Sequence, residues 1–386
     1  MSFTLSTEHE TLIAALQATM SGFDDDYWAE RDRSGEFPLD FVETLAEGGW
    51  LGITMPEEFG GSGLGVFDAA LMMTEVAKCG GMTAASSVHM NIFGPKSLIK
   101  FGTPEQSARW LPGIIAGKSR MCFAVTEPNT GLDTTRLTTR AVRNGDRYIV
   151  NGHKIWTSTA QVADKIMLIA RTSERDEANP TAGLSLFFAD MDRRAIDVRQ
   201  IDKMGRKAID SNELFIDNFE IPADDLVGEE GKGFDYLLHS LNPERILIAA
   251  EAVGLGLDAL RRATQYARDR VVFGRPIGMN QSIQHPLAAG WANLEAARMM
   301  ICKAAALYDA GQPCGVEANA AKYLAAEAAQ DMCRQSMATH GGMGYAREYH
   351  VERLFREVMI PYLAPVSQQL ALCFLAERAL GLPKSY

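Results

Sequence analysis

Phe123-Ala124-Val125-Thr126-Glu127-Pro128 opens the most informative segment of this chain, and Lys154-Ile155-Trp156-Thr157-Ser158 closes it. Both runs are strand-like and both carry hydroxyl groups. An indole face stacks well on a flat aromatic ring, and the hydroxyls of Thr126 and Ser158 can bond to the edge of such a ring. The segment therefore predicts a site for a flat aromatic cofactor.

The residues around this segment predict an antiparallel β unit from about 120 to 225. Alternating apolar and polar residues at 138–142 and 147–150 flank Asn144-Gly145-Asp146, which is typical of a hairpin turn. Asn151-Gly152 predicts a second turn directly afterwards. Further strands are expected at 153–157, 165–170, 184–189 and 213–216.

The chain before the β unit has a helical pattern. Two apolar helices are expected at 69–78 and 82–101. The next helix has a clear start signal, because Thr103 is a suitable N-cap, Pro104 takes the first helical position and Gln106 completes a capping box. We therefore expect an all-helical N-terminal domain.

The chain after the β unit returns to the helical period. One long segment runs from Phe234 to about Phe273, and a second has apolar residues at helical spacing from Ile283 to Ile301. Two more helices are expected, with a break near Gly341-Gly342-Met343-Gly344. Four helices of this kind predict an up-and-down bundle. The expected fold class is α+β, with an N-terminal all-helical domain at 1–119, a central antiparallel β-barrel-like domain at 120–228 and a C-terminal four-helix bundle at 229–386.

Composition excludes several classes of partner. Hydrophobic residues make up 47% and charged residues 23% of the chain, which is typical of a folded globular protein. The formal net charge is −11, and Lys and Arg are dispersed. Because nucleic-acid binders carry a basic stripe and anionic lipid attracts basic segments, we expect neither nucleic acid nor a membrane as a partner.

Other familiar signals are absent from the sequence. The six cysteines form no C-x-x-C pair and have no ligand spacing with histidine, so no metal site is expected. Gly61-Ser62-Gly63 begins a dinucleotide-binding G-x-G-x-x-G motif, but Val66 replaces the third glycine and a helix precedes it. Met1-Ser2-Phe3-Thr4 does not begin a signal peptide, and no uncharged apolar run approaches the ~20 residues of a membrane span. We expect a soluble, cytoplasmic protein.

Six segments, in matching order and separation, resemble the acyl-CoA dehydrogenase family over nearly the whole chain. They are Thr126-Glu127-Pro128, Lys154-x-Trp156-x-Ser158, Lys203-Met204-Gly205, Arg270-x-x-Phe273-Gly274, Gln281 and Gly341-Gly342-Met343-Gly344-Tyr345. The resemblance implies FAD as the cofactor. It also implies a homo-oligomer, commonly a tetramer, in which FAD is shared across a subunit boundary.

The resemblance assigns contacts to both ends of FAD. Phe123, Val125 and Thr126 would border the flavin ring, with Trp156 and Ser158 on its other edge and Ser158 near the reactive nitrogen. Glycines allow backbone N–H groups to approach phosphate closely. The pyrophosphate and adenine of a neighbouring subunit's FAD would be reached from Arg270, Phe273, Gln281, Gly341 and Gly342.

The family's reaction needs a base beside the thioester. The proton α to the carbonyl is removed while the β-hydrogen leaves as hydride to the flavin, so the base must reach that proton and donors must face the carbonyl oxygen. Many members carry the base, a Glu, on the loop that enters the last helix, where this chain has Ala364. The backbone N–H of Ala364 is still expected to donate to the thioester oxygen.

Asn242-Pro243-Glu244-Arg245 matches a second arrangement, found in isovaleryl-CoA and long-chain members, in which the Glu lies on the long helix. The resemblance implies Glu244 as the base and Arg245 as the partner of CoA or of the site's charge. The residues alone allow another interpretation. With Asn242 as an N-cap and Pro243 in the first turn, Glu244 would only complement the helix dipole.

Other positions bear on the acyl group and on CoA. His89 falls where the family walls the acyl tail. It is either a core histidine with its hydrogen bond satisfied or, if it faces the cavity, a sign of a polar acyl group. Leu132 and Ala338 replace a Ser that often contacts CoA and a Gln near the adenine. The CoA half of the site therefore matches the family less well than the flavin half.

The expected function is FAD-dependent oxidation of an acyl-CoA to the trans-2-enoyl-CoA, with an electron-transferring flavoprotein as the acceptor. Two alternatives remain open. The same scaffold performs non-redox elimination on a substituted acyl-CoA in some relatives, and a flavin- or CoA-binding protein without turnover would carry the same segments. The sequence does not specify the acyl group.

Overall fold

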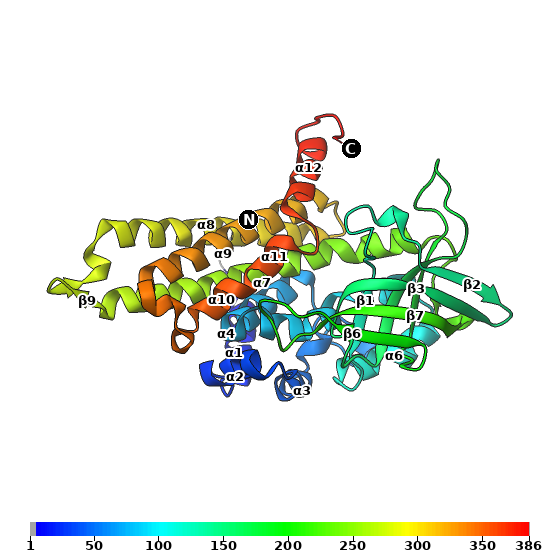
Figure 1. Cartoon of the computed structure of the whole chain (residues 1–386), viewed down its shortest axis with the longest axis horizontal. Helices are drawn as coiled ribbons and strands as arrows, with labels where there is room; N and C mark the ends of the chain where they lie inside the picture. Colours follow the sequence, from blue (N-terminus) through cyan, green and yellow to red (C-terminus); the bar gives the residue numbers. More distant parts are fainter. Residues whose placement is uncertain (1–4, 386) are drawn as a thin grey trace.

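The structure is a computed structural model that describes residues 5–385. Residues 1–4, on which the prediction about a signal peptide rests, lie outside the described residues. Helices fill one side of the molecule and the strands gather at the other (Figure 1). The N-terminal helices are α1 (Thr7–Thr19), α2 (Asp25–Ser34), α3 (Leu39–Glu47), α4 (Val66–Phe93), α5 (Lys96–Phe101) and α6 (Pro104–Ile115).

The start of α6 confirms its sequence signal. The Thr103 hydroxyl accepts a hydrogen bond from the Gln106 backbone N–H at 3.2 Å, and the Gln106 side chain accepts one from the Thr103 backbone N–H at 3.0 Å. Pro104 takes the first helical position, where its missing N–H leaves no bond unmade. The capping box is therefore formed as predicted.

The predicted break between the two apolar helices, at 79–81, coincides with a kink, because the backbone of Gly80 and Gly81 is not helical. α4 passes through a kink at Gly80 and Gly81 and continues to Phe93. Gly81 has a φ of +70°, and a Cβ there would lie 2.6 Å from Glu357 Oε2, so glycine permits both the kink and the close approach of α10. The second expected helix, 82–101, is divided, because α4 ends at Phe93 and Pro95 precedes α5.

An eight-stranded sheet forms the central part of the fold, in the order β6-β7-β3-β2-β4-β5-β8 with β1 beside β4. The pairing is antiparallel as predicted, except that β1 runs parallel to β4 and one residue pair of β2 and β4 is parallel. β6 and the short β8 had no expected counterpart. The strands are β1 (Met121–Ala124), β2 (Arg140–Asn144), β3 (Arg147–Ser158), β4 (Lys165–Arg171), β5 (Leu184–Asp190), β6 (Ile196–Gln200), β7 (Ser211–Pro222) and β8 (Leu226–Val227).

β3 corrects the prediction of a turn at Asn151-Gly152. The chain continues through these residues as one strand, and the register against β7 shifts between Val150 and Gly152. A Cβ on Gly152 would lie 2.3 Å from Thr139 Oγ1, so the glycine serves close packing within a bulge. The hairpin between β2 and β3 is confirmed.

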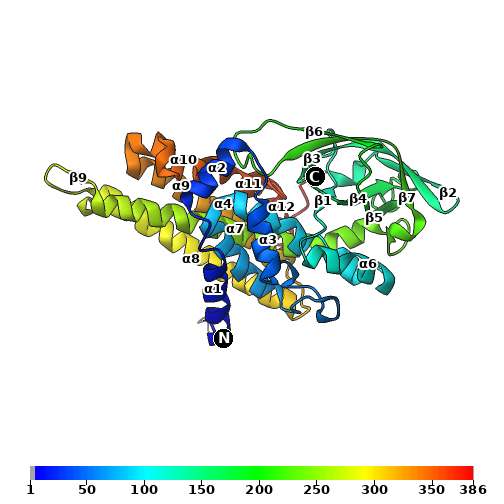
Figure 2. The same cartoon turned by 90° about the horizontal axis from the view of Figure 1, so that it is seen from below.

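The C-terminal part confirms three of the four expected bundle helices, α7 (Gly233–Asp269), α8 (Gln281–Asp309) and α9 (Gly315–His340). The fourth position is not one long helix. A hairpin of two-residue strands joins α7 to α8 and projects from the far end of the molecule (Figure 2). The remaining elements are β9 (Val271–Val272), β10 (Arg275–Pro276), α10 (Val351–Glu357), α11 (Met359–Leu363) and α12 (Gln368–Arg378).

The segment 351–378 bears on the prediction of no membrane partner. A window of 18 residues there has a mean hydropathy of 1.5, which by length and composition alone is enough for a membrane span. The structure divides the segment into α10, α11 and α12 with breaks at Val358 and at 364–367. Since one such segment is weak support for a membrane, the expectation of none stays a prediction.

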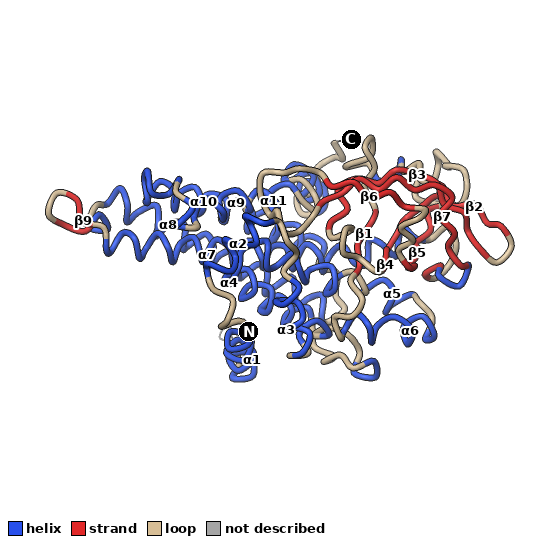
Figure 3. The backbone as a smooth tube through the Cα atoms, turned by 60° about the horizontal axis from the view of Figure 1, so that its bottom comes forward, coloured by secondary structure: helices blue, strands red, loops and turns tan. Residues whose placement is uncertain are grey.

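One hydrophobic core joins the N-terminal helices to the bundle, because α4 packs along α7. The sheet has its own core on one face, and its other face packs against α6 and the start of α7. Figure 3 shows the strands of the sheet in red at one end of this helical body and the β9 hairpin in red at the other. Of the predicted site residues, His89 lies on α4, Ser158 on β3 and Glu244 on α7.

Candidate active site

The two segments that the sequence singled out lie side by side. The Ile155 backbone N–H donates to the Thr126 carbonyl at 2.9 Å. Lys154 Nζ donates to the Val125 carbonyl, also at 2.9 Å. Direct bonds thus join the loop after β1 to β3, and the predicted flavin-binding residues of both segments share one surface.

A buried ion pair fixes this arrangement. Lys154 Nζ lies 3.0 Å from Glu127 Oε1, and the carboxylate also accepts from the backbone N–H groups of Thr138 and Thr139 at 2.7 and 2.9 Å. Burial alone would raise the pKa of Glu127, but Lys154 and these hydrogen bonds lower it to about 2. Burial lowers the pKa of Lys154 to about 8. The pair therefore stays ionised at neutral pH.

A β-bulge turns Trp156 out of the sheet. The register of β3 against β7 shifts between Lys154 and Thr157, and Trp156 has a φ of +61°, a conformation that bulky residues rarely adopt. Its side chain is 57% exposed, whereas Ser158 is recessed, with 8% exposed. An open indole beside a recessed hydroxyl fits a flat aromatic ring, which agrees with the cofactor shape expected from the sequence.

Glu244 lies inside α7, well beyond the start of the helix at Gly233. The interpretation of Asn242 and Pro243 as a helix start is therefore wrong, because α7 continues through them. Burial raises the pKa of Glu244 to about 7, while His89 lowers it to a smaller extent. Within residues 5–385 the half-buried carboxyl has no hydrogen-bond or ion-pair partner. A carboxyl of this kind suits a general base.

His89 and Glu251 form a buried pair close to Glu244. His89 Nδ1 lies 2.5 Å from Glu251 Oε1. Burial alone would lower the pKa of His89, but Glu251 and, more weakly, Glu244 raise it overall. Glu244 and Glu251 are two helical turns apart on one face of α7, about 10 Å along its axis. This geometry favours the interpretation of His89 as a core histidine with its hydrogen bond satisfied.

Arg245 and Ala364 each have a hydrogen-bond partner within the chain. Arg245 Nη1 donates to Asn242 Oδ1 at 3.1 Å, and burial lowers the pKa of its guanidinium. Ala364 ends α11, and its backbone N–H already donates to the Ile360 carbonyl at 2.9 Å. Contrary to the prediction, this N–H is not free to bind a thioester oxygen in this structure.

The remaining predicted cofactor residues lie at the opposite end of the molecule, around the β9–β10 hairpin (Figures 1 and 2). Phe273, between the two strands, is fully exposed. Within one chain these residues do not meet Trp156 and Ser158. They are Arg270, Phe273, Gln281, Gly341 and Gly342.

Two buried charged residues near the site were not predicted. Arg206 donates to Ser158 Oγ at 3.2 Å, and Glu251 pairs with His89. The sequence held a faint signal for each: Arg206 directly follows the Lys203-Met204-Gly205 motif, and Glu251 is a lone carboxylate in an apolar helical run. Neither sequence pattern predicts that the charged side chain is buried.

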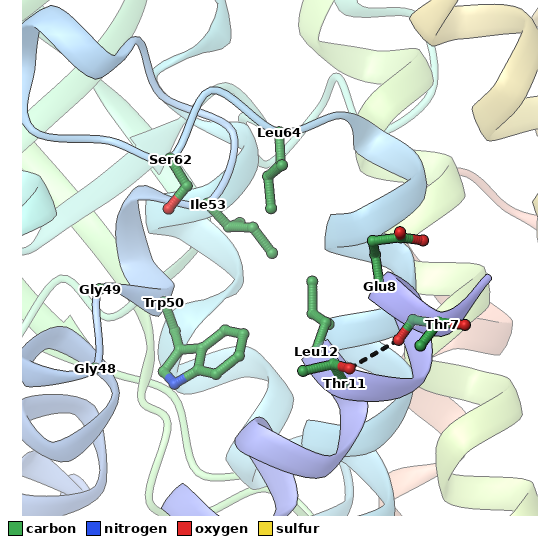
Figure 4. A pocket seen from close by; sticks show the side chains of 10 residues that line it. All are labelled: Thr7, Glu8, Thr11, Leu12, Gly48, Gly49, Trp50, Ile53, Ser62 and Leu64. Carbon is green, nitrogen blue, oxygen red and sulfur yellow. Dashed lines mark hydrogen bonds between the residues drawn. The ribbon is translucent and has the colours of Figure 1, made fainter. Parts of the chain in front are cut away.

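One open pocket lies apart from the predicted site residues. A pocket of about 500 Å³ lies between α1 and the segment 48–64, and Figure 4 shows its apolar lining of Leu12, Trp50, Ile53 and Leu64. None of the predicted site residues lines it. Across residues 5–385 no group of three or more His, Cys, Asp or Glu is placed to hold a metal ion.

Known proteins provide an independent comparison. Family models for the acyl-CoA dehydrogenase N-terminal, middle and C-terminal domains match residues 6–118, 122–219 and 231–378. Acyl-CoA dehydrogenase FadE12 of Mycobacterium tuberculosis is 36% identical over 387 residues, covering 100% of this chain and 99% of that protein. The caffeyl-CoA reductase-Etf complex subunit CarC of Acetobacterium woodii is 32% identical, covering 86% of this chain and 87% of that protein. A solved structure described as the FAD complex of PigA is 25% identical, with a TM-score of 0.93 over 99% of this chain and 100% of that chain.

Proposed function

Because the chain belongs to the acyl-CoA dehydrogenase family of FAD-dependent oxidoreductases, we propose that it oxidises an acyl-CoA to the trans-2-enoyl-CoA with Glu244 as the base. The observation that carries this proposal is the state of Glu244: half-buried, without a partner among residues 5–385, and with a pKa raised to about 7. Ala364, at the position where many members carry the base, has no carboxylate.

Each part of the chain then has a defined task. Phe123, Thr126, Trp156 and Ser158 would hold the flavin ring. When bound, FAD supplies the acceptor for the hydride that leaves the β-carbon. Ionised Glu244 takes the α-proton, and its raised pKa makes it a stronger base than an ordinary carboxylate while leaving it ionised in part at neutral pH.

The partners follow from the same proposal. The exposed residues around Phe273 would reach the FAD of a neighbouring copy, which makes a homo-oligomer, a tetramer or a dimer of dimers, part of the complete site. An electron-transferring flavoprotein is the proposed acceptor, in keeping with the name of the relative from an Etf complex. Arg245 is the proposed contact for CoA or for the charge of Glu244.

The test is the variant Glu244→Gln, compared with Asp235→Asn. Asp235 is an exposed carboxylate on the first turn of the same helix, so its variant controls for loss of charge on α7. General-base catalysis is worth about 10²–10⁴ in rate, and Glu244→Gln should lose activity in this range while retaining FAD. Retention of FAD with less than a tenfold loss would reject Glu244 as the base.

Product analysis separates the alternatives. Anaerobic bleaching of the flavin by members of an acyl-CoA panel, with the matching enoyl-CoA formed, supports dehydrogenation. A product formed without flavin reduction would point to elimination. No bleaching by branched, cyclic, hydroxylated or straight-chain acyl-CoA would point to a binding protein without turnover.

A further inference from the structure

Arg206 is a buried cation that no carboxylate neutralises directly. It lies in the connection between β6 and β7 and is 8% exposed. Its guanidinium donates to three hydroxyls: Ser86 of α4 at 3.0 Å, Ser158 of β3 at 3.2 Å and Ser211 of β7 at 3.4 Å. Within the described part of the chain it has no ion-pair partner, and its Nε has no hydrogen-bond partner.

Other buried arginines of this protein are compensated. Arg353, whose Nε also lacks a hydrogen-bond partner, lies 3.4 Å from the carboxylate of Glu357 and donates to a backbone carbonyl. Arg171 donates to four backbone carbonyls. A buried charge is costly unless it is paired and fully hydrogen-bonded. The hydrogen-bond acceptors of Arg206 are three serine hydroxyls, and the carboxylates of Glu357, Glu251 and Asp210 act on it without forming an ion pair within 4 Å.

The backbone around Ser158 is strained. Six described non-glycine residues have positive φ, and three of them converge here. Trp156 (+61°) and Thr159 (+60°) flank Ser158, and Arg206 (+55°) donates to it. Each such residue costs on the order of 1–3 kcal/mol, and strain of this kind gathers at functional sites. Rare backbone conformations therefore occur on both sides of the hydrogen bond between Arg206 and Ser158.

We propose that Arg206 is a positioning residue that acts through Ser158 to stabilise the negative charge that reduction places on the bound flavin. The inference rests on the proposed function, since it takes Ser158 to face the flavin. Arg206 donates to Ser158 Oγ, so the hydroxyl proton of Ser158 is free to be donated toward the cofactor. A hydroxyl that accepts from a cation is a stronger donor.

The charge balance of the reaction explains why a cation is useful there. The β C–H bond breaks and its hydrogen leaves as hydride, with two electrons, to the flavin. The α C–H bond breaks, its electron pair forms the new C=C bond, and its proton goes to Glu244. The flavin thereby gains one negative charge and Glu244 loses one. A fixed positive charge close to Ser158 favours the reduced flavin over the oxidised one.

The experiment is the two-electron midpoint potential of bound FAD, measured without any acyl-CoA. Arg206→Gln removes the charge, Arg206→Lys keeps it, and Lys207→Gln removes the same charge from the exposed neighbouring residue. Arg206→Gln should bind reduced FAD at least tenfold less well relative to oxidised FAD, which lowers a two-electron potential by about 30 mV. Arg206→Lys should retain most of the wild-type potential, and Lys207→Gln should match it.

Titration of each protein with oxidised and with reduced FAD gives the ratio of the two dissociation constants, which is linked to the midpoint potential. This titration replaces the potential measurement if Arg206→Gln binds FAD too weakly. Ser158→Ala should abolish most of the difference between arginine and glutamine at 206. An unchanged ratio in Arg206→Gln would overturn the proposal, even if turnover of acyl-CoA fell. That result would leave Glu244 untouched, because no step of these measurements uses the base.

Discussion

Two groups of predicted cofactor residues differ in how the chain supports them. The inner group, Phe123, Val125, Thr126, Trp156 and Ser158, sits on segments joined by backbone bonds and by the buried pair of Lys154 and Glu127. The outer group, Arg270, Phe273, Gln281, Gly341 and Gly342, is exposed at the far end of the bundle (Figure 2). The inner group is organised before any partner arrives. The outer group is exposed, and we propose that it meets the FAD of a neighbouring copy.

The largest expected effect comes from breaking the support of the inner group. Lys154→Met leaves the Glu127 carboxylate buried without its cation, and removal of one partner of such a pair costs about 3–5 kcal/mol. We expect a lower urea midpoint and loss of FAD. Lys165→Met is the matched control, because Lys165 of the same sheet pairs with the exposed Asp190, and surface pairs contribute about 0–1 kcal/mol. Equal midpoints for the two variants would contradict the prediction.

The same pair predicts the behaviour in acid. The pKa of Glu127 is lowered to about 2 in the folded chain, below its ordinary value of 4.5. Its contribution to stability is therefore present above about pH 4.5 and is lost as the pH falls toward 2. Lys154→Met should lack this part of the acid-induced loss.

The second-largest effect is expected from a substitution in the outer group. Phe273 is fully exposed, so Phe273→Ser should change the stability of the chain by less than about 0.5 kcal/mol. If Phe273 reaches a neighbouring copy, the variant should lose about 2 kcal/mol of FAD affinity, the size of an interface hot spot. Sedimentation and FAD titration measure both quantities. The control is Leu380→Ser, which also changes an exposed apolar residue. Equal FAD affinity in the two variants would show that Phe273 does not contact FAD.

The sequence-based predictions discussed next, which the structure confirms, depended on residues that are neighbours in the sequence. The capping box of Thr103 and Gln106 and the hairpin at Asn144-Gly145-Asp146 depend on neighbouring residues alone, and both form as expected. Asn151-Gly152 has the composition of a turn, yet it lies within β3, because Thr139 on the neighbouring segment needs the space that Gly152 leaves. Local propensity there gave way to tertiary packing.

The direction of buried side chains was harder to predict. The pattern Asn242-Pro243 allowed a helix start with Asn242 as the N-cap and Glu244 in the first turn, and only the resemblance pointed to a base. The structure shows Glu244 inside α7 with a raised pKa, although its catalytic role stays a prediction. Arg206 and Glu251 escaped prediction, because periodicity does not reveal which charged residue turns inward to meet a partner distant in sequence.

A third prediction compares the pH dependence of catalysis by Glu244 with the pH dependence of FAD binding by the inner group. Since burial raises the pKa of Glu244 to about 7, kcat/KM should fall about tenfold per pH unit below that value as the base is protonated. FAD should stay bound over the same range, because Glu127, with a pKa of about 2, remains ionised. A kcat/KM that stays flat from pH 5 to 8 would assign the α-proton to another group.

The stability of Glu244→Gln gives a readout free of catalysis. The folded pKa of Glu244 lies above the ordinary 4.5, so the folded chain binds more protons than the unfolded one between about 4.5 and 7, and this residue destabilises the fold as the pH rises through that window. The free energy of unfolding of Glu244→Gln minus that of wild type should therefore be larger at pH 8 than at pH 5. The expected increase is on the order of 1–3 kcal/mol. Urea denaturation at the two pH values measures the difference.

The smallest effect concerns the charges that surround Glu244. His89 lowers the pKa of Glu244 and Glu251 raises it, with the effect of His89 the larger. The double variant His89→Gln/Glu251→Gln removes both charges and keeps a hydrogen bond possible between the two side chains. The acid limb of kcat/KM should therefore move to higher pH by less than about one unit. A move to lower pH would mean that Glu251, not His89, dominates the field at Glu244, and a change in acyl-group preference without any move would instead place His89 against the substrate.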